Sequence, residues 1–279
     1  MMKKWIATLL TLALVLSCGA VMADAAAPFT GKITIGATPS PHAEILEFAK
    51  PLFAEKGIEL EIIEFTDYIL PNQATESGEL FANYFQHKPY MVDFNANNGT
   101  HLVEAIAVHF EPMAIYPGRT ATLDAIQDGA LIAVPNDSTN EARALLLLEA
   151  NGLITIAPDK GVLATKDDVI DNPHNIELVE MEAVQVPLKL PDVDFAVING
   201  NYALGVGLSA ATDSLAAETA DSLSAETYIN YVVVKEGADE AMIAALRDVL
   251  NSQAVIDFMT EKYQGAVIPM FTVEEVPAE

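Results

Sequence analysis

Hydrophobic and polar positions along this chain follow two alternating periods. Residues 59–65 alternate charged and apolar side chains, which is typical of a strand. The apolar residues between Ile45 and Phe53 instead recur at helical spacing. Strand-like and helix-like segments continue to alternate along most of the chain. This order predicts an α/β fold with largely parallel sheets covered by helices.

The expected elements can be assigned to residue ranges. We expect strands at 32–37, 59–65, 79–83, 130–134, 176–181, 195–198 and 228–235. We expect helices at 41–56, 71–77, 87–97, 139–151, 199–205, 239–250 and 253–263. Pro51 lies inside the first helix and should kink or split it. The stretch 209–225, rich in Ala, Ser, Thr and Asp, predicts a surface excursion.

Two passages predict that the chain crosses between two lobes. The long apolar run 102–116 contains Pro112, as expected for a strand that leaves one sheet and enters another. A second crossing is expected near 225–230. These crossings place 31–113 and 229–271 in lobe 1 and 114–228 in lobe 2. Such lobes close about a hinge when a ligand binds, and we assign Glu111 and Pro112 to the hinge.

The N-terminus predicts export. Lys3 and Lys4 precede an apolar run at 5–16 that is too short to span a bilayer, which indicates a signal peptide within residues 1–23. Residues 15–18 (Val-Leu-Ser-Cys) resemble a lipobox in which Cys18 is lipidated, whereas residues 21–23 suit ordinary cleavage. The mature protein is therefore expected to be a cell-membrane lipoprotein or a periplasmic protein. Residues 272–279 form an acidic tail.

Composition excludes several classes of function. The net charge of −26 argues against binding to nucleic acid or to anionic lipid head groups. Cys18 is the only cysteine, so the mature domain has no intramolecular disulfide and no thiol-based site. The sequence has no Gly-x-Ser-x-Gly, phosphate-loop or His-Glu-x-x-His motif, so we expect neither an enzyme nor a cofactor. The scattered positions of His42, His101, His109 and His174 predict no metal site.

One run of sequence concentrates the aromatic residues, which make up only 7% of the chain. Between residues 82 and 90, Tyr84, Phe85 and Tyr90 surround His87. A strand that ends in such a cluster, followed by a helix start that contains proline, predicts an aromatic-walled pocket. Open α/β sheets bind their ligands at strand ends of this kind. A core aromatic patch beside a surface histidine is the alternative.

Six runs are distinctive in combination, namely 36–46, 82–90, 132–137, 140–145, 196–203 and 265–271. Together they resemble the NlpA family, the methionine-binding lipoproteins of ABC importers. The resemblance implies a two-lobed periplasmic-binding-protein clamshell of type II. It also implies a monomer that captures L-methionine outside the membrane and delivers it to a permease with its ATPase. D-Methionine, a Met-containing dipeptide or another apolar amino acid is an alternative ligand, and a secreted enzyme on a similar fold is a third possibility.

The residues make chemical sense of such a ligand. The turn 136–140 feeds a helix, so its free backbone N–H groups are expected to form an anion site. Arg143 lies one turn further, where its planar fork can grip a carboxylate. An exposed Arg143 that pairs with Glu149 or solvent is the alternative.

Two asparagines are candidate acceptors for an ammonium group. Asn199 ends an apolar strand, and Asn230 lies within one, where an unpaired amide costs about 1–3 kcal/mol. Helix capping by Asn199 and a backbone bond by Asn230 are the alternatives. The resemblance leaves Asn201 open and implies eight ligand contacts, namely Tyr68, Phe85, His87, Tyr90, Asn140, Arg143, Asn199 and Asn230. The aromatic members would face the thioether, because sulfur–aromatic contacts are favourable.

Overall fold

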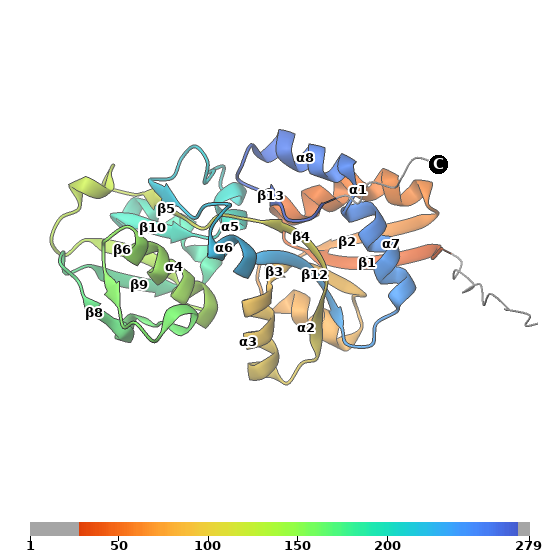
Figure 1. The fold of residues 1–279 in the computed structure, drawn as a ribbon, viewed down its shortest axis with the longest axis horizontal. Coiled ribbons are helices and arrows are strands. Elements are labelled where there is room, and N and C mark those ends of the chain that lie inside the picture. Colours follow the sequence, from red (N-terminus) through yellow and green to blue (C-terminus); the bar gives the residue numbers. More distant parts are fainter. Residues whose placement is uncertain (1–27, 273–279) are drawn as a thin grey trace, which may run out of the picture.

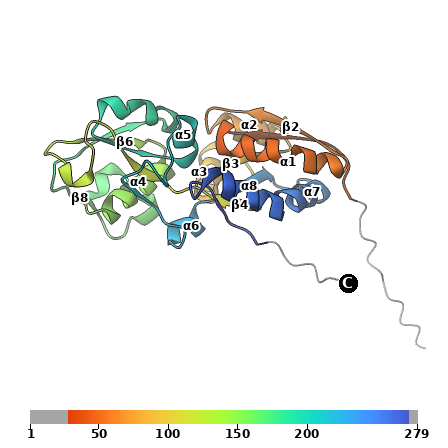
Figure 2. The same ribbon diagram turned by 90° about the horizontal axis from the view of Figure 1, so that it is seen from above.

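The computed structural model describes residues 28–272, which form two lobes, each built on its own β-sheet (Figure 1). The lobes lie end to end along the long axis in both views (Figure 2). The expected signal peptide with Cys18, and residues 273–279 of the expected tail, lie outside the described residues. Among the described residues, none of the helices combines the length and apolar character that a membrane crossing requires.

The first lobe contains a six-stranded sheet in the order β13-β4-β12-β3-β1-β2. Its strands are β1 (Gly31–Ala37), β2 (Ile58–Glu64), β3 (Ala82–His87), β4 (Leu102–Phe110), β12 (Ile229–Lys235) and β13 (Ile268–Pro269). Its helices are η1 (Pro39–Ala43), α1 (Glu44–Glu55), α2 (Leu70–Ser77), α3 (Lys88–Asn98), α7 (Glu240–Leu250) and α8 (Gln253–Tyr263).

Alternation along β12 divides the core of this lobe into two layers. Val232 and Val234 pack with residues of α1, α7 and α8. Val233 points to the opposite face and packs with Met91 and Phe94 of α3. The sheet is therefore buried on both faces, as successive side chains of a strand point to opposite sides.

The second lobe contains a five-stranded sheet in the order β11-β5-β10-β6-β9. Its strands are β5 (Ala114–Pro117), β6 (Leu131–Pro135), β9 (Glu177–Met181), β10 (Phe195–Ile198) and β11 (Ala216–Ala217), and β7 (Thr155–Ile156) pairs with β8 (Val169–Asp171). Its helices are α4 (Ser138–Ala150) and α5 (Gly200–Gly205), whereas α6 (Leu223–Thr227) precedes the second crossing, and its Ala225 packs with Phe110 of β4. Short 3₁₀ turns occur at η2 (Leu123–Ala125), η3 (Gly161–Leu163), η4 (Lys166–Asp168), η5 (Ala183–Gln185) and η6 (Pro187–Asp192). The α4 helix covers one face of the sheet, and Ala203 of α5 packs on the other.

The chain crosses between the lobes twice. The first crossing joins β4 to β5, and the second leads back from the second sheet into β12. The two-lobed α/β fold with two crossings is therefore confirmed. The boundaries expected for the lobes, 31–113 with 229–271 and 114–228, stay a prediction.

The expectation of largely parallel sheets is wrong. The β1 strand runs parallel to β2 and β3, but β12 is antiparallel to both of its neighbours, β3 and β4. The cause is the double crossing, since β4 leaves the first lobe and β12 returns to it in the opposite direction. In the second sheet, β5 likewise runs antiparallel to β10 and β11.

Two expectations about local structure also differ from the structure. Pro51 does not split its helix, because α1 runs unbroken from Glu44 to Glu55. Pro51 is exposed, while the opposite face, with Ile45 and Phe53, is buried. The strand expected at 79–83 is instead β3, at Ala82–His87, and all six of its residues are buried. A strand buried on both faces shows no polar–apolar alternation, which is why its bounds were misplaced.

Candidate functional site

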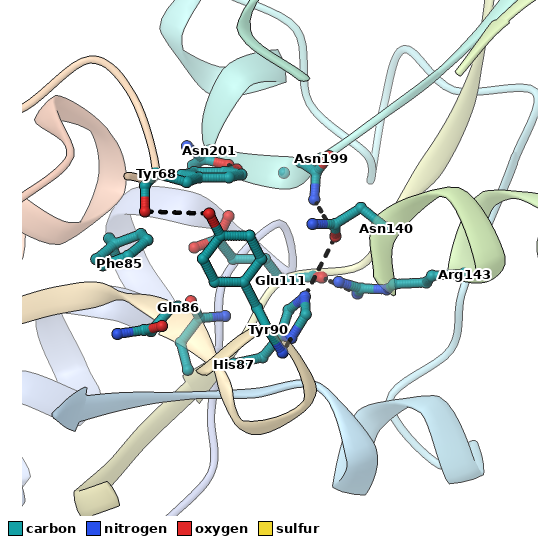
Figure 3. Close-up of a pocket in the computed structure, with 12 residues that line it drawn as sticks. Tyr68, Phe85, Gln86, His87, Tyr90, Glu111, Asn140, Arg143, Asn199 and Asn201 are labelled. Carbon is teal, nitrogen blue, oxygen red and sulfur yellow. Dashed lines mark hydrogen bonds between the residues drawn. The ribbon is translucent and has the colours of Figure 1, made fainter. Parts of the chain in front are cut away.

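A small cavity lies between the lobes, lined by side chains from both of them (Figure 3). All eight predicted ligand contacts line it. The other lining residues are Gln86, Glu111, Gly200 and Asn201. The sequence therefore located the cavity, whereas the ligand-binding roles of these residues stay a prediction.

Aromatic rings form one wall of the cavity. The centroid of Tyr68 lies 5.5 Å from that of Phe85 and 5.5 Å from that of Tyr90. Tyr202, which sequence reasoning missed, lies 4.9 Å from Tyr68 on the outer side. Tyr202 is the third residue of α5 and belongs to the second lobe, so the aromatic wall contains residues of both lobes. The sequence feature that could have located Tyr202 is its position three residues after Asn199.

Hydrogen bonds fix these rings. The Tyr90 hydroxyl donates to the backbone oxygen of Tyr68 over 3.1 Å, and the Tyr68 hydroxyl donates to Asn201 Oδ1 over 2.6 Å. Burial raises the pKa of Tyr68 well above its ordinary value, so the phenol stays neutral. The wall is therefore uncharged and largely apolar, and the hydroxyl groups of Tyr68 and Tyr90 are hydrogen-bonded within the protein.

His87 is a neutral donor at the start of α3. Its Nδ1 accepts from the Tyr90 backbone N–H over 3.2 Å. The proton must then be on Nε2, which lies 3.2 Å from Asn140 Oδ1. Burial, with Arg143 nearby, lowers the pKa of His87 to about 3. His87 thus holds Asn140 and does not serve as a base.

Asn199 presents a buried acceptor that no described residue engages. Its Nδ2 donates to Asn140 Oδ1 over 2.7 Å, continuing the line of bonds from His87 (Figure 3). Its Oδ1 is buried and has no hydrogen-bond partner within residues 28–272. The side chain does not cap α5, so the capping alternative is excluded. A buried oxygen without a donor is costly, and a ligand N–H would satisfy it.

The anion site expected at the start of α4 is already filled in part by the chain itself. Asp137 caps the helix, and its Oδ1 accepts from the Asn140 backbone N–H over 3.0 Å. The same carboxylate accepts from Asn140 Nδ2 over 2.9 Å. The expectation of free N–H groups in this turn is therefore wrong for Asn140, since a capping carboxylate satisfies that donor.

Arg143 is buried and ion-paired with a residue that sequence reasoning missed. Its Nε donates to Glu218 Oε1 over 2.9 Å, and its Nη2 lies 2.5 Å from Glu218 Oε2. Neither Glu149 nor solvent is its partner. Nη2 also donates to the backbone oxygen of Glu111 over 2.8 Å. Nη1 forms no hydrogen bond with any described residue, which leaves one edge of the fork for a ligand.

The stretch 209–225 is consequently more than a surface excursion. It contains β11, which adds a strand beside β5, and Glu218, which follows that strand with a side chain only 6% exposed. Glu218 is one of 40 acidic residues in the sequence, and no local pattern distinguishes it. Only the fold brings it to Arg143.

His42 and His109 meet at Glu111, so the expectation that the histidines are scattered is wrong for this pair. Glu111 Oε1 lies 2.8 Å from His109 Nε2 and 3.2 Å from His42 Nε2. Their potential ligand atoms lie within 4.8 Å of one another, and this is the one cluster of three histidine or acidic residues at such spacing in residues 28–272. Thr38 and Tyr84 bond the far ring nitrogens of His42 and His109.

Asn230 connects this cluster to the cavity. It is the second residue of β12, paired with His87 of β3 and His109 of β4. Its Oδ1 lies 3.1 Å from His42 Nε2. The expected partner of this buried amide is thus a histidine side chain, and the amide still lines the cavity.

Comparisons with known proteins agree on one family. The profile described as NlpA lipoprotein matches residues 33–271. D-methionine-binding lipoprotein MetQ of Escherichia coli (strain K12) is 38% identical over 240 residues, covering 85% of this chain and 87% of that protein. The crystal structure of lipoprotein Tp32 from Treponema pallidum is 42% identical, with a TM-score of 0.81, and covers 86% of this chain and 100% of that chain. A nutrient binding protein from Burkholderia cenocepacia, solved bound to methionine, is 34% identical, with a TM-score of 0.81 and coverage of 86% and 100%.

Proposed function

The chain belongs to the NlpA lipoprotein family, and on that premise we propose that it captures L-methionine outside the membrane and delivers it to an ABC importer. In this role it is the binding component of a transporter and not an enzyme. Its partners would be an ABC permease with its ATPase.

The observation that carries this proposal is the pairing of unengaged polar atoms with an aromatic wall in one cavity. Arg143 Nη1 offers a charged donor to a carboxylate, and Asn199 Oδ1 offers an acceptor to an ammonium group. Tyr68, Phe85 and Tyr90 supply an apolar, polarizable surface on the other side. A free amino acid with an apolar side chain matches both halves, and the thioether of methionine gains from aromatic contact.

D-Methionine is the second candidate ligand. The E. coli relative is named for D-methionine, and the relative from B. cenocepacia was solved with methionine bound. Both enantiomers carry the same three groups, so the same atoms of Arg143 and Asn199 could receive either. A Met-containing dipeptide or another apolar amino acid remains a further alternative in the same class.

A thermal-shift screen distinguishes these ligands. The mature protein would first be unfolded and refolded to remove any ligand carried through purification, then tested against the twenty amino acids and D-methionine. We expect the largest rise in melting temperature with L-methionine, because a ligand that binds only the folded state stabilises it. A larger rise with D-methionine would move the assignment to that enantiomer. No rise with either enantiomer would contradict the proposal.

A further inference from the structure

We infer that the Glu111 carboxylate is the counter-charge for the ammonium group of the bound amino acid, and that His42 and His109 hold it in position. This inference rests on the proposed function, since it concerns the head group of that ligand. It adds a role in binding to the hinge role that the sequence predicted for Glu111, which stays a prediction.

Glu111 is placed where an ammonium group must lie if Arg143 takes the ligand carboxylate. Both residues line the cavity, and the Glu111 backbone oxygen is bonded directly to Arg143 Nη2. Figure 3 shows the Glu111 side chain behind the Tyr90 ring. An α-amino acid carries both of its charges on one carbon, so it requires a cation and an anion side by side. Arg143 and Glu111 meet that requirement.

The balance of charge leaves Glu111 in need of a cation. Arg143 and Glu111 are the only residues with formal charge among those lining the cavity. Arg143 is already neutralised by Glu218, which lies outside the cavity lining. Within residues 28–272, Glu111 has only two histidines as ion partners. A buried anion is costly without a counter-charge, and an ammonium group would supply one.

The histidines are neutral donors that engage one oxygen of Glu111. The Tyr84 hydroxyl, completely buried, donates to His109 Nδ1, which places the His109 proton on Nε2, facing Glu111 Oε1. Asn230 Oδ1 can only accept, so the His42 proton is also on Nε2, shared between Asn230 and Glu111 Oε1. Burial lowers the pKa of His42 to about 4 and that of His109 to about 3. Both histidines therefore contact Oε1 of Glu111, and neither contacts Oε2.

The second oxygen faces the residue that follows Asn199. A Cβ added at Gly200 would lie 2.8 Å from Glu111 Oε2 and 2.8 Å from Glu111 Cβ, so only glycine allows this approach. Asn199, with its unpartnered Oδ1, is the adjacent residue. A primary ammonium donates three hydrogen bonds. Glu111 Oε2 and Asn199 Oδ1 would accept two of them.

Burial supports the same assignment. It raises the pKa of the Glu111 carboxyl, a rise opposed by His42, by Arg143 and by the backbone N–H of Asn201. The carboxylate is therefore costly to keep charged in the unliganded site. A ligand ammonium group would stabilise the charged form of the Glu111 carboxyl, and this attraction would strengthen binding. A ligand without an ammonium group would lack this contribution.

The wild-type protein provides the first test. L-Methionine and 4-(methylthio)butanoate, which is methionine without its amino group, would be titrated by calorimetry into refolded protein dialysed against EDTA. We expect the desamino compound to bind at least about thirtyfold more weakly, because it leaves a buried carboxylate unpaired. A gap below about threefold would overturn the inference, even if no variant folds. Methionine binding that disappears with EDTA and returns with a divalent metal would also overturn it, since Glu111 would then serve the metal.

The variant Glu111→Gln provides the second test. It keeps the shape and removes the charge, so we expect at least about a thirtyfold loss for L-methionine and less than about a threefold change for the desamino compound. Glu76→Gln is the matched control, because it removes the same charge from a surface pair with Lys235 and should change neither affinity by more than about threefold. Equal losses for both ligands in Glu111→Gln would make Glu111 structural and overturn the inference.

The positioning role of the histidines has its own readout, the ratio of the two affinities. His109→Gln keeps an N–H donor for Glu111, whereas His109→Leu removes it. We expect His109→Leu to lower the ratio of methionine to desamino affinity several-fold more than His109→Gln does. Equal ratios would remove His109 from the inference. If the wild-type protein prefers another amino acid, the methionine proposal fails, and the role of Glu111 is then tested with that amino acid and its desamino form. If the protein binds no amino acid, both the methionine proposal and the Glu111 inference are overturned.

Discussion

Arg143 and Glu218 form a buried ion pair, with Nη2 of the guanidinium 2.5 Å from Oε2 of the carboxylate. The same Glu218 oxygen accepts from the Met113 backbone N–H over 2.8 Å, at the first crossing between the lobes. Glu218 therefore ties Arg143 to the crossing. The guanidinium is held in one orientation by the protein's own carboxylate, which leaves Nη1 as the donor for a ligand.

Removal of Glu218 should destabilise the free protein. Glu218→Ala leaves Arg143 buried without a partner, which costs about 3–5 kcal/mol of unfolding free energy. Urea denaturation of the ligand-free protein measures this loss. Asp248→Ala is the control, because it breaks an exposed pair with Lys56 and should cost no more than about 1 kcal/mol. Equal losses in the two variants would contradict the buried-pair interpretation.

Removal of Arg143 should abolish methionine binding. Arg143→Ala deletes the charged donor in the cavity, and we expect calorimetry to show a loss of well over tenfold in affinity. The variant should also lose stability, because Glu218 is then buried alone. The double variant Arg143→Ala/Glu218→Ala should recover part of that stability and still not bind. An affinity for Arg143→Ala within about threefold of wild type would remove Arg143 from the site.

The aromatic wall should set the preference for a thioether. Phe85→Leu removes a ring that faces Tyr68, and we expect the preference for methionine over leucine to fall by up to about tenfold, the range of sulfur–aromatic contacts. Phe48→Leu is the control, since that ring stacks on Phe258 away from the cavity. A preference unchanged by Phe85→Leu would mean that this ring makes no selective contact.

Three buried histidines should make the fold sensitive to mild acid. Burial lowers the pKa of His42 to about 4, and those of His87 and His109 to about 3, from 6.5. Below pH 6.5 the unfolded chain binds protons that the folded protein does not, so the unfolding free energy falls as the pH falls. Each histidine contributes up to about 1.4 kcal/mol per pH unit. The carboxyl groups of Glu111, Asp137 and Glu141 oppose this trend, because burial raises their pKa values, so the net slope is smaller than the sum for the three histidines.

Urea unfolding between pH 7.5 and pH 5.0 measures this slope. His109→Gln should reduce the slope by up to about 1.4 kcal/mol per pH unit, because one buried histidine is removed. An unfolding free energy that does not change over this range would contradict the neutral, buried state of the histidines.

Cys18 is predicted to carry a lipid that anchors the mature protein to a membrane. The prediction depends on the lipobox at 15–18, which follows a short apolar run. Intact-mass measurement of the native protein should show a diacylglyceryl-cysteine at the N-terminus. A mature chain that starts unmodified at Asp24 would instead indicate ordinary secretion and a freely diffusing protein.

The sequence predicted best what local pattern determines. The run 82–90 indicated an aromatic pocket because strand, ring cluster and helix start are contiguous there. Asn199 was placed correctly because an apolar strand and a helix start meet at that residue. Arg143 lies three residues after Asn140 in α4, so helix geometry makes the two side chains neighbours, and both line the cavity.

Contacts between residues distant in the chain could not be predicted in this way. Glu218 reaches Arg143 across 75 positions, through a two-residue strand too short to leave a pattern. His42 follows β1 and His109 lies in β4, 67 positions later, so only the tertiary fold brings both to Glu111. The antiparallel pairing of β12 was missed for the same reason, since strand direction depends on the crossings and not on the residues of the strand.

Calorimetric titration of refolded, ligand-free mature protein with L-methionine and with leucine tests the central claim most directly. Leucine fills much of the same apolar volume but has a branched γ-carbon and no sulfur. A hydrophobic pocket separates such similar side chains by about 1–3 kcal/mol, so we predict that L-methionine binds tens- to hundreds-fold more tightly than leucine. Equal affinities for methionine and leucine, or binding of neither, would contradict the account.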